Sequence, residues 1–400
     1  MRPRSTSRAR LWLVAGSLVL ALAMTEVGLR LAARWLFIDN FIAPDPVLGW
    51  VIRPGFGGWV TDENNLWVQI NSEGFRDRER SIAPPPHTLR VAVMGDSFIH
   101  GYFVPLEQTY SSFLEQGLAP CAARSDRQVE VLNFGVLGYG TTQELLTYRY
   151  RASRYSPNIV VLAVFTQNDI YDNHAALSTE PAPRYVFQGD ELVLDNSFRT
   201  QLPAPSKWPL RRRLFEYLTT HSRTIWLLNS TNGRIHEYLD GREGERTIDV
   251  GPEVLDTAIY RPPVDSEMRE AWKVTEALLL KFSEEVRANG AEFWIVTLSN
   301  TIQIDPDLAK RRAFQDRLGV DSLFYPDRRI AALAKAHGIP VVSLAEPLSE
   351  YTAAHGTYLN GGKTREVPFG EGHWNEVGNR IGADLTAKQM CTESGALGRE

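Results

Sequence analysis

Cysteine is scarce in this sequence, and basic residues are not in excess. Cys121 and Cys391 are the only cysteines among 400 residues, and no histidines flank them at the spacing of zinc ligands, which argues against a zinc site built on them. In an oxidising compartment the two thiols could form a disulfide or could remain separate. The formal net charge is −5, so the composition gives no reason to expect a nucleic-acid partner.

Internal repeats and long low-complexity stretches are also absent, so nothing indicates a repeat architecture. What the sequence has instead is the composition of a globular protein with a substantial core, 43% hydrophobic and 23% charged residues. Its length fits one large domain with insertions, or two domains.

The N-terminus is basic and then strongly apolar. Residues 1–10 contain four arginines and no acid. The apolar stretch that follows could be a signal peptide cleaved near Ala21–Ala23, or an uncleaved signal anchor over residues 11–31. We favour the anchor, in which Glu26 and Arg30 pair at i,i+4 near the headgroups and the basic tail stays in the cytoplasm. Either interpretation places the rest of the chain outside the cytoplasm.

Residues 37–85 differ in composition from both neighbouring segments. They are rich in Gly, Pro, Trp and Asn, which predicts a small β-rich region of short strands and turns, and they end in a proline run typical of a stiff linker. Trp50, Trp59 and Trp67 could form a sugar-stacking surface. Tryptophans more often fill a small β core, and that is the interpretation we prefer.

From residue 86 to residue 392 the chain alternates between apolar runs and helical patterns. This alternation predicts an α/β domain, with a parallel sheet covered on both faces and an insertion at about 171–264. The strands are expected at 89–97, 128–136, 157–169, 291–299 and 339–348. The helices are expected at 107–118, 141–155, 266–288 and 328–338, with a last one from about residue 375.

Ser97 follows the first of these strands directly, in the sequence Gly95-Asp96-Ser97. A serine hydroxyl is a weak nucleophile until a base removes its proton, and histidine is the usual base. His373 has the most distinctive context of the eight histidines, a Gly-rich loop before the last helix. Glu371, two residues earlier, could accept a hydrogen bond from its Nδ1–H and hold the ring.

A serine nucleophile also needs donors for the oxyanion that forms on its substrate. Three candidates lie at predicted strand ends, where active sites of open α/β sheets occur. They are the backbone N–H of Ser97, the N–H of Gly138, and the side-chain amide of Asn168. Asp96 reads as a turn or cap residue beside the nucleophile.

No G-x-S-x-G motif surrounds Ser97, which disfavours the ordinary α/β-hydrolase fold. The order Gly95-Asp96-Ser97, Gly138, Asn168 and His373 instead resembles the SGNH/GDSL hydrolases, over about residues 89–385. The resemblance implies a three-layer α/β/α sandwich of the flavodoxin-like kind. It implies Ser97 as nucleophile, His373 as base, and Ser97, Gly138 and Asn168 as oxyanion donors. The family usually has an acid three residues before the histidine; here that position is Gly370, and Glu371 is the nearest acid.

Together these features predict a membrane-anchored, extracytoplasmic serine esterase, with an acylated carbohydrate as its substrate and the membrane as its other partner. The preferred substrate, an O-acetyl ester, follows from compartment and resemblance only. No metal or organic cofactor is expected, and the sequence specifies no protein partner. Two alternatives stay open: an O-acyltransferase that modifies envelope polysaccharide, and a non-catalytic glycan-binding or scaffold protein.

Overall fold

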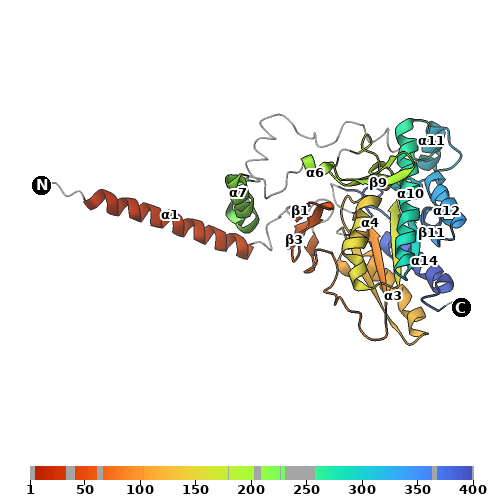
Figure 1. Cartoon of the computed structure of the whole chain (residues 1–400), viewed down its shortest axis with the longest axis horizontal. Coiled ribbons are helices and arrows are strands. Elements are labelled where there is room, and N and C mark those ends of the chain that lie inside the picture. The colour runs from red at the N-terminus through yellow and green to blue at the C-terminus, as the bar shows by residue number, and fades with distance from the viewer. Residues whose placement is uncertain are drawn as a thin grey trace. The chain divides into compact units, whose positions relative to one another are not determined.

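The computed structural model describes residues 5–32, 41–60, 66–101, 103–178, 180–201, 209–225, 227–229, 257–362 and 367–398 (Figure 1). The chain divides into two compact units. One contains Met1–Asp39 and Pro203–Ile248, and the other contains Asn40–Leu202 and Asp249–Glu400. Parts of the predicted basic tail, of the small β-rich region and of the insertion lie outside the described residues.

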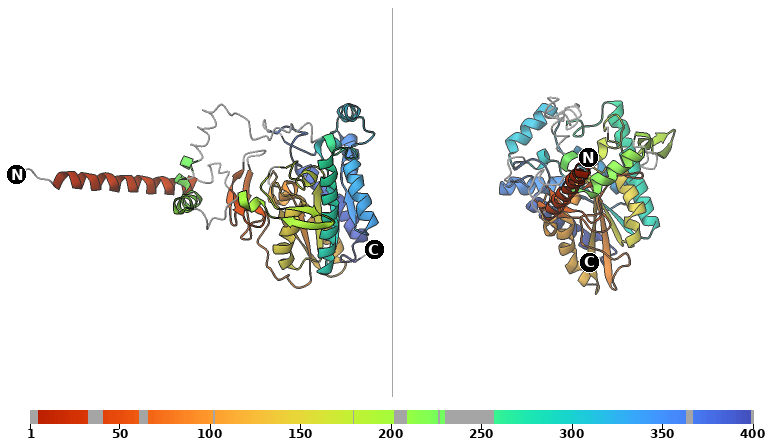
Figure 2. Two further views of the ribbon diagram at one scale, coloured as in Figure 1. Left: turned by 45° about the horizontal axis from the view of Figure 1, so that its top comes forward. Right: turned by 90° about the vertical axis from the view of Figure 1, so that its left-hand side faces the viewer.

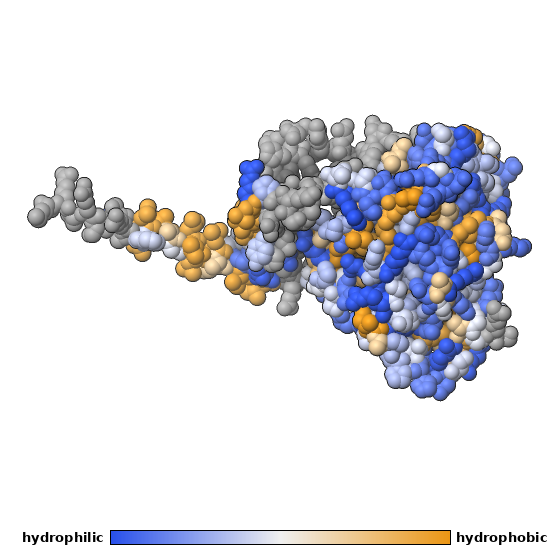
Figure 3. All heavy atoms as spheres, in the orientation of Figure 1, coloured by the Kyte–Doolittle hydropathy of each residue, from blue (hydrophilic) through white to orange (hydrophobic). Residues whose placement is uncertain are grey.

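The smaller unit contains a long apolar helix, α1 (Ser5–Ala32). Its segment Arg10–Ala32 is long and apolar enough to cross a membrane, a test that a signal sequence near an N-terminus also passes. Apolar side chains cover much of its surface (Figure 3). The predicted pair forms, with Arg30 Nε 2.8 Å from Glu26 Oε1. Length and composition therefore agree with the predicted anchor without excluding a cleaved signal.

The larger unit is built on a five-stranded parallel sheet with the order β11-β10-β7-β5-β6. Numbered along the chain, this is the order 2-1-3-4-5 of flavodoxin-like folds. The predicted flavodoxin-like α/β/α architecture is therefore confirmed. The strands are β5 (Thr88–Gly95), β6 (Gln128–Gly135), β7 (Ile159–Phe165), β10 (Glu292–Leu298) and β11 (Val341–Ser343).

Both faces of the sheet are buried, because helices cover each of them (Figures 1 and 2). Successive side chains of a strand point to opposite faces. In β5, Val91 and Val93 accordingly belong to one core cluster, and Ala92 and Met94 to the other. Helices α4 (Thr141–Tyr150), α10 (Ser266–Ala288) and α12 (Tyr325–Ala336) contribute to the second cluster, and α3 (Tyr110–Ala123), α13 (Ala345–His355) and α14 (Glu376–Glu393) to the first.

The last strand is shorter than predicted. The apolar run at 339–348 forms a strand only at Val341–Ser343, and α13 begins at Ala345. Leu344 and Leu348 are both buried, and their i,i+4 spacing is that of a helix face. A short apolar run fits either element by pattern alone, and here packing selects the helix.

The described part of the small β-rich region packs against the sheet and not around a core of its own. It forms two hairpins, β1 (Ile42–Asp45) with β2 (Gly49–Ile52), and β3 (Gly57–Val60) with β4 (Leu66–Gln69). Its buried apolar side chains join one of the two sheet clusters. Trp50 packs half-buried against that cluster, whereas Trp67 is 40% exposed; the side chain of Trp59 lies outside the described residues. The region is thus part of the larger unit.

The described parts of the insertion fall in both units. The hairpin β8 (Arg184–Gln188) with β9 (Glu191–Asp195), and the short α6 (Phe198–Gln201), belong to the larger unit. Helix α7 (Leu210–His221) belongs to the smaller unit with α1. Within that unit the Glu26 carboxylate accepts hydrogen bonds from residues that follow α7, including the Ser222 hydroxyl at 2.9 Å.

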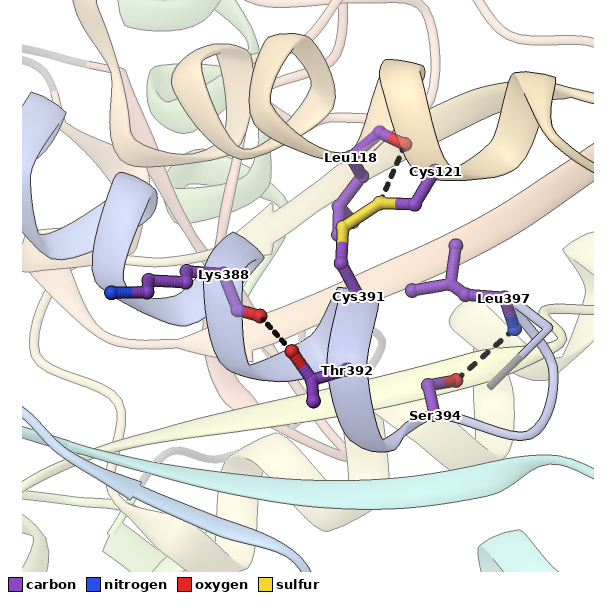
Figure 4. Close-up of a disulfide and its surroundings, with 7 residues drawn as sticks. All are labelled: Leu118, Cys121, Lys388, Cys391, Thr392, Ser394 and Leu397. Atoms are coloured by element: carbon purple, nitrogen blue, oxygen red, sulfur yellow. Dashed lines mark hydrogen bonds between the residues drawn. A yellow bond between two sulfur atoms is a disulfide. The ribbon is translucent and has the colours of Figure 1, made fainter. Parts of the chain in front are cut away.

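Helices α3 and α14 lie against one another and hold the C-terminal end of the chain on the sheet. A Cβ atom on Gly117 of α3 would lie 2.7 Å from the Cβ of Ala387, so only glycine allows this close approach. The structure joins Cys121 of α3 to Cys391 of α14 by a disulfide (Figure 4). Residues 270 positions apart in the sequence are thereby linked covalently.

We expect the double substitution Cys121→Ala and Cys391→Ala to lower the free energy of unfolding by about 2–4 kcal/mol, because the cross-link restricts the unfolded chain. The measurement is the guanidinium midpoint of the detergent-solubilised protein, with the parent protein in reductant as the control. Equal midpoints for the oxidised parent and the double variant would show that the bond does not form.

Candidate active site

Ser97 stands at the carboxyl end of β5, the strand between β6 and β7. β5 ends at Gly95, and a four-residue helix, α2 (Ser97–His100), begins at once. The buried Asp96 caps this helix by accepting a hydrogen bond from Phe98 N–H at 2.9 Å, the cap role its position suggested. A Cβ on Gly95 would lie 2.4 Å from Ile99 Cγ1, so the sharp turn requires glycine. Together these constraints fix where the Ser97 side chain points.

The structure brings the predicted base to the predicted nucleophile. His373 Nε2 lies 2.7 Å from Ser97 Oγ. Phe103 stacks on the imidazole with ring centroids 3.9 Å apart, and Phe98 lies 4.8 Å away at a tilt. A hydrogen bond of this length allows proton transfer between the serine and the ring.

Backbone contacts on both sides of His373 hold its loop. The His373 carbonyl accepts a hydrogen bond from Gly361 N–H at 2.9 Å, and the Asn360 side chain donates to the Gly372 carbonyl. The next residue, Trp374, is buried and donates through Nε1 to Ser299 Oγ at 3.1 Å. These contacts fix the backbone on both sides of His373 and so limit where its side chain can lie.

The stacking residue Phe103 belongs to a loop that is held by a buried arginine. Arg76, from the small β-rich region, donates to the backbone carbonyls of Gly101 and Val104. Burial lowers the pKa of Arg76 to about 9. Sequence reasoning did not single out Arg76 as part of the site. The one sequence feature that could have pointed to Arg76 is the segment "NSEGFRD", which contains it and precedes the Gly95-Asp96-Ser97 turn.

Gly138 and Asn168 follow the two strands that flank β5. Gly138 comes three residues after β6 and is exposed, with φ +68°. Asn168 begins the short α5 (Asn168–Tyr171) after β7. Its side chain lies near Asp96, and its Oδ1 makes no hydrogen bond to the described residues. Among those residues no acceptor is assigned to the N–H of Ser97 or of Gly138. Both N–H groups are thus available to a ligand.

Four carboxyl groups cluster near the nucleophile, those of the buried Asp96, Glu144 and Asp169 and that of the half-buried Asp172. Sequence reasoning missed this cluster because its members are scattered along the chain. Burial raises the pKa of Asp96 and that of Asp172 to about 6. Burial, with the charges of neighbouring acids, raises the pKa of Glu144 and that of Asp169 well above their ordinary values. Both Glu144 oxygens lack a hydrogen-bond partner in the described structure. In that part of the chain no group of three or more acidic, histidine or cysteine side chains is arranged to hold a metal ion.

Glu371, the predicted orienting acid, precedes His373 by two residues in the loop before α14. Its side chain is exposed, and within the described residues no hydrogen bond joins it to His373. Among the described residues, the buried carboxyl of Asp96 interacts electrostatically with His373. The role predicted for Glu371 therefore lacks a supporting contact and stays a prediction.

A pocket next to Gly138 combines residues from three parts of the larger unit. Trp50 comes from the small β-rich region, Gly138 from the loop after β6, and Asp172 and Arg184 from the insertion. The first part of the insertion thus lines a hollow beside a predicted oxyanion donor.

The sequence matches no family model and no curated protein. Among solved structures, an acetyl xylan esterase is 14% identical, with 75% of this chain and 99% of that chain covered and a TM-score of 0.38. A catalytic mutant of an acetylxylan esterase from Geobacillus stearothermophilus is 12% identical, with 78% and 95% covered and a TM-score of 0.36. A protein from Desulfitobacterium hafniense assigned to the G-D-S-L family of lipolytic proteins is 13% identical, with 75% and 98% covered and a TM-score of 0.34. These values are low, so the likeness says nothing of activity or substrate.

The buried acids should make stability depend on pH. Between about pH 4 and the raised pKa values, the unfolded chain loses protons that the folded chain keeps, so the free energy of unfolding falls as pH rises. Glu144→Gln replaces a titrating carboxyl by a neutral amide, so this group no longer contributes to the pH dependence of the free energy of unfolding. We expect it to raise the melting temperature by a few degrees at pH 8 and to change it little at pH 4.5.

The matched control is Glu346→Gln, which alters an exposed acid on α13 that pairs with Arg328. The quantity to compare is the difference in melting temperature from the parent at each pH. A Glu144→Gln difference that is the same at pH 4.5 and pH 8 would contradict a protonated, buried Glu144.

Proposed function

We propose that the chain is a serine esterase of the SGNH/GDSL type, which hydrolyses a carboxylic ester through an acyl-serine intermediate. The observation that carries the proposal is the 2.7 Å contact between Ser97 Oγ and His373 Nε2 at the carboxyl end of β5. The flanking strands β6 and β7 lead into Gly138 and Asn168 at the same edge of the sheet. A nucleophile in contact with a base, with candidate oxyanion donors after the neighbouring strands, is an arrangement that supports acyl transfer.

In the first half of the reaction, His373 Nε2 takes the hydroxyl proton while Ser97 Oγ bonds to the ester carbonyl carbon. The negative charge that develops on the carbonyl oxygen is stabilised by the N–H groups of Ser97 and Gly138 and by the Asn168 amide. The intermediate collapses when the carbon–oxygen bond to the alcohol breaks. The imidazolium gives its proton to the departing alcohol, which leaves an acyl-serine.

In the second half, water replaces the alcohol. His373 takes a proton from the water as its oxygen bonds to the acyl carbon. The second tetrahedral intermediate expels Ser97 Oγ, which regains a proton from His373, and the carboxylic acid is released. Every step uses side-chain and backbone groups of this chain and needs no redox partner.

The substrate class proposed is an O-acetyl ester of a carbohydrate, acted on outside the cytoplasm. Support comes from the apolar N-terminal helix and from a disulfide, a bond typical of oxidising compartments. The resemblance of the Ser97, Gly138, Asn168 and His373 segments to SGNH hydrolases is the second support. An acyltransferase would use the same acyl-serine with a sugar hydroxyl in place of water.

The decisive experiment follows release of acetate from acetylated xylo-oligosaccharides, and of alcohol from short-chain aryl esters, by the full chain in detergent. We expect Ser97→Ala and His373→Ala each to lower kcat/KM by roughly 10³-fold or more. Ser81→Ala and His355→Ala, at exposed positions, are the matched controls. If the folded parent has only background activity with and without a glycan acceptor, the non-catalytic alternative is favoured. Acyl transfer exceeding hydrolysis would favour the transferase.

A second pair of variants tests the orienting acid. Because Glu371 is exposed, we expect Glu371→Gln to lower kcat less than tenfold. Loss of the charge of an acid that is hydrogen-bonded to the catalytic histidine lowers kcat by roughly 10⁴-fold in a serine protease. Glu376→Gln, at a half-buried acid in the first turn of α14 that pairs with Arg380, controls for the removal of charge alone. A loss of a hundredfold or more in Glu371→Gln alone would restore the sequence-based assignment.

A further inference from the structure

Three hydrogen bonds tie the small β-rich region to the loop that contains Gly138. The indole Nε1–H of Trp50 donates to the Leu137 carbonyl at 2.9 Å. The Tyr139 hydroxyl donates to the Trp50 carbonyl at 2.6 Å, and the Gln143 side chain donates to the Leu48 carbonyl at 2.8 Å. The segment "LGW" at 48–50 is therefore hydrogen-bonded to residues before and after Gly138, although it lies some 90 residues earlier in the chain.

The bond from the indole acts on the peptide group that carries the Gly138 N–H. The Leu137 carbonyl and the Gly138 N–H belong to one planar peptide unit. All peptide bonds of the described residues are trans, and in a trans unit the carbonyl and the N–H point in opposite directions. Holding the carbonyl against Trp50 therefore directs the N–H away from Trp50, where no acceptor is assigned to it in the described structure.

This loop needs such an external constraint. Gly138 has φ +68°, in the left-handed region, and is exposed. Glycine is the residue whose backbone rotates most freely, so its peptide would otherwise sample several orientations. An oxyanion donor is effective only when it points at the developing charge before the reaction begins.

Trp50 is itself held firmly. It lies in β2, which pairs with β1, and its ring packs at 65° against Tyr139 with centroids 5.7 Å apart. Its Cζ2 atom is 3.4 Å from the position that a Cβ on Gly138 would take. The indole thus contacts the loop through both its ring and its N–H.

We propose that Trp50 is a positioning residue of the esterase, whose indole N–H fixes the Leu137–Gly138 peptide so that the Gly138 N–H faces the substrate oxyanion. The inference rests on the proposed esterase function. It also gives the small β-rich region a part in catalysis, since the residue that aligns one oxyanion donor comes from that region.

The test is Trp50→Phe, which removes the N–H donor and keeps an aromatic ring. Trp67→Phe, on the neighbouring hairpin, is the matched control. Active sites are counted by labelling Ser97 to completion with a fluorophosphonate and measuring the intact mass. We expect kcat per labelled site to fall roughly tenfold to a hundredfold in Trp50→Phe, since a misdirected donor loses part of its contribution. KM should stay within about threefold, and the pH profile should keep its shape because His373 is unchanged.

Tyr139→Phe provides a second variant should Trp50→Phe give few labelled sites. It removes the hydrogen bond to the Trp50 carbonyl but keeps the ring, and we expect kcat per labelled site to fall about threefold to tenfold. If kcat per labelled site equals that of the parent in every Trp50→Phe and Tyr139→Phe preparation that can be labelled, the positioning role is overturned while the esterase stands. If Ser97→Ala is as active as the parent, the esterase function fails, and the positioning role fails with it.

Discussion

The hydrogen bond between Ser97 and His373 joins residues 276 positions apart, and the rest of the larger unit is arranged to permit it. Closing so long a segment costs chain entropy that local structure cannot offset. The parallel sheet fixes one end of the contact, because β5 lies between β6 and β7 and delivers Ser97 to the shared edge. The packing of α14 on α3, with the disulfide between them, fixes the helix that follows His373.

Electrostatics around this contact differ on its two sides. The solvent side holds the exposed Glu371, whereas the buried side holds Asp96 with other carboxyl groups behind it. A carboxyl in a low-dielectric interior favours its neutral form, and neighbouring acids strengthen that preference. Asp96 interacts electrostatically with His373 and also with Glu144 and Asp169 of the acid cluster.

The small β-rich region acts on the site from two directions. Trp50 holds the loop of Gly138, and Arg76 holds the loop of Phe103, which stacks on His373. In both contacts a side-chain N–H group, from an indole or a guanidinium, donates to backbone carbonyls that follow the strands of the sheet. The composition of the chain changes near residue 85, but the packing does not separate there. Residues of the region before it form hydrogen bonds with the loops that follow β5 and β6.

The sequence by itself determined the parallel α/β architecture, the strand-end serine and the loop histidine. Buried strands, helix stripes and turn residues are local signals, and they placed Ser97, Gly138 and Asn168 after predicted strands and His373 in a loop before the last helix. The tertiary structure alone decided that Asp96 interacts with His373, that four carboxyls scattered in sequence cluster together, and that Trp50 donates a hydrogen bond to the Leu137 carbonyl. Such contacts join side chains that are distant in sequence, so their partners depend on how the layers pack, and no local periodicity encodes that packing.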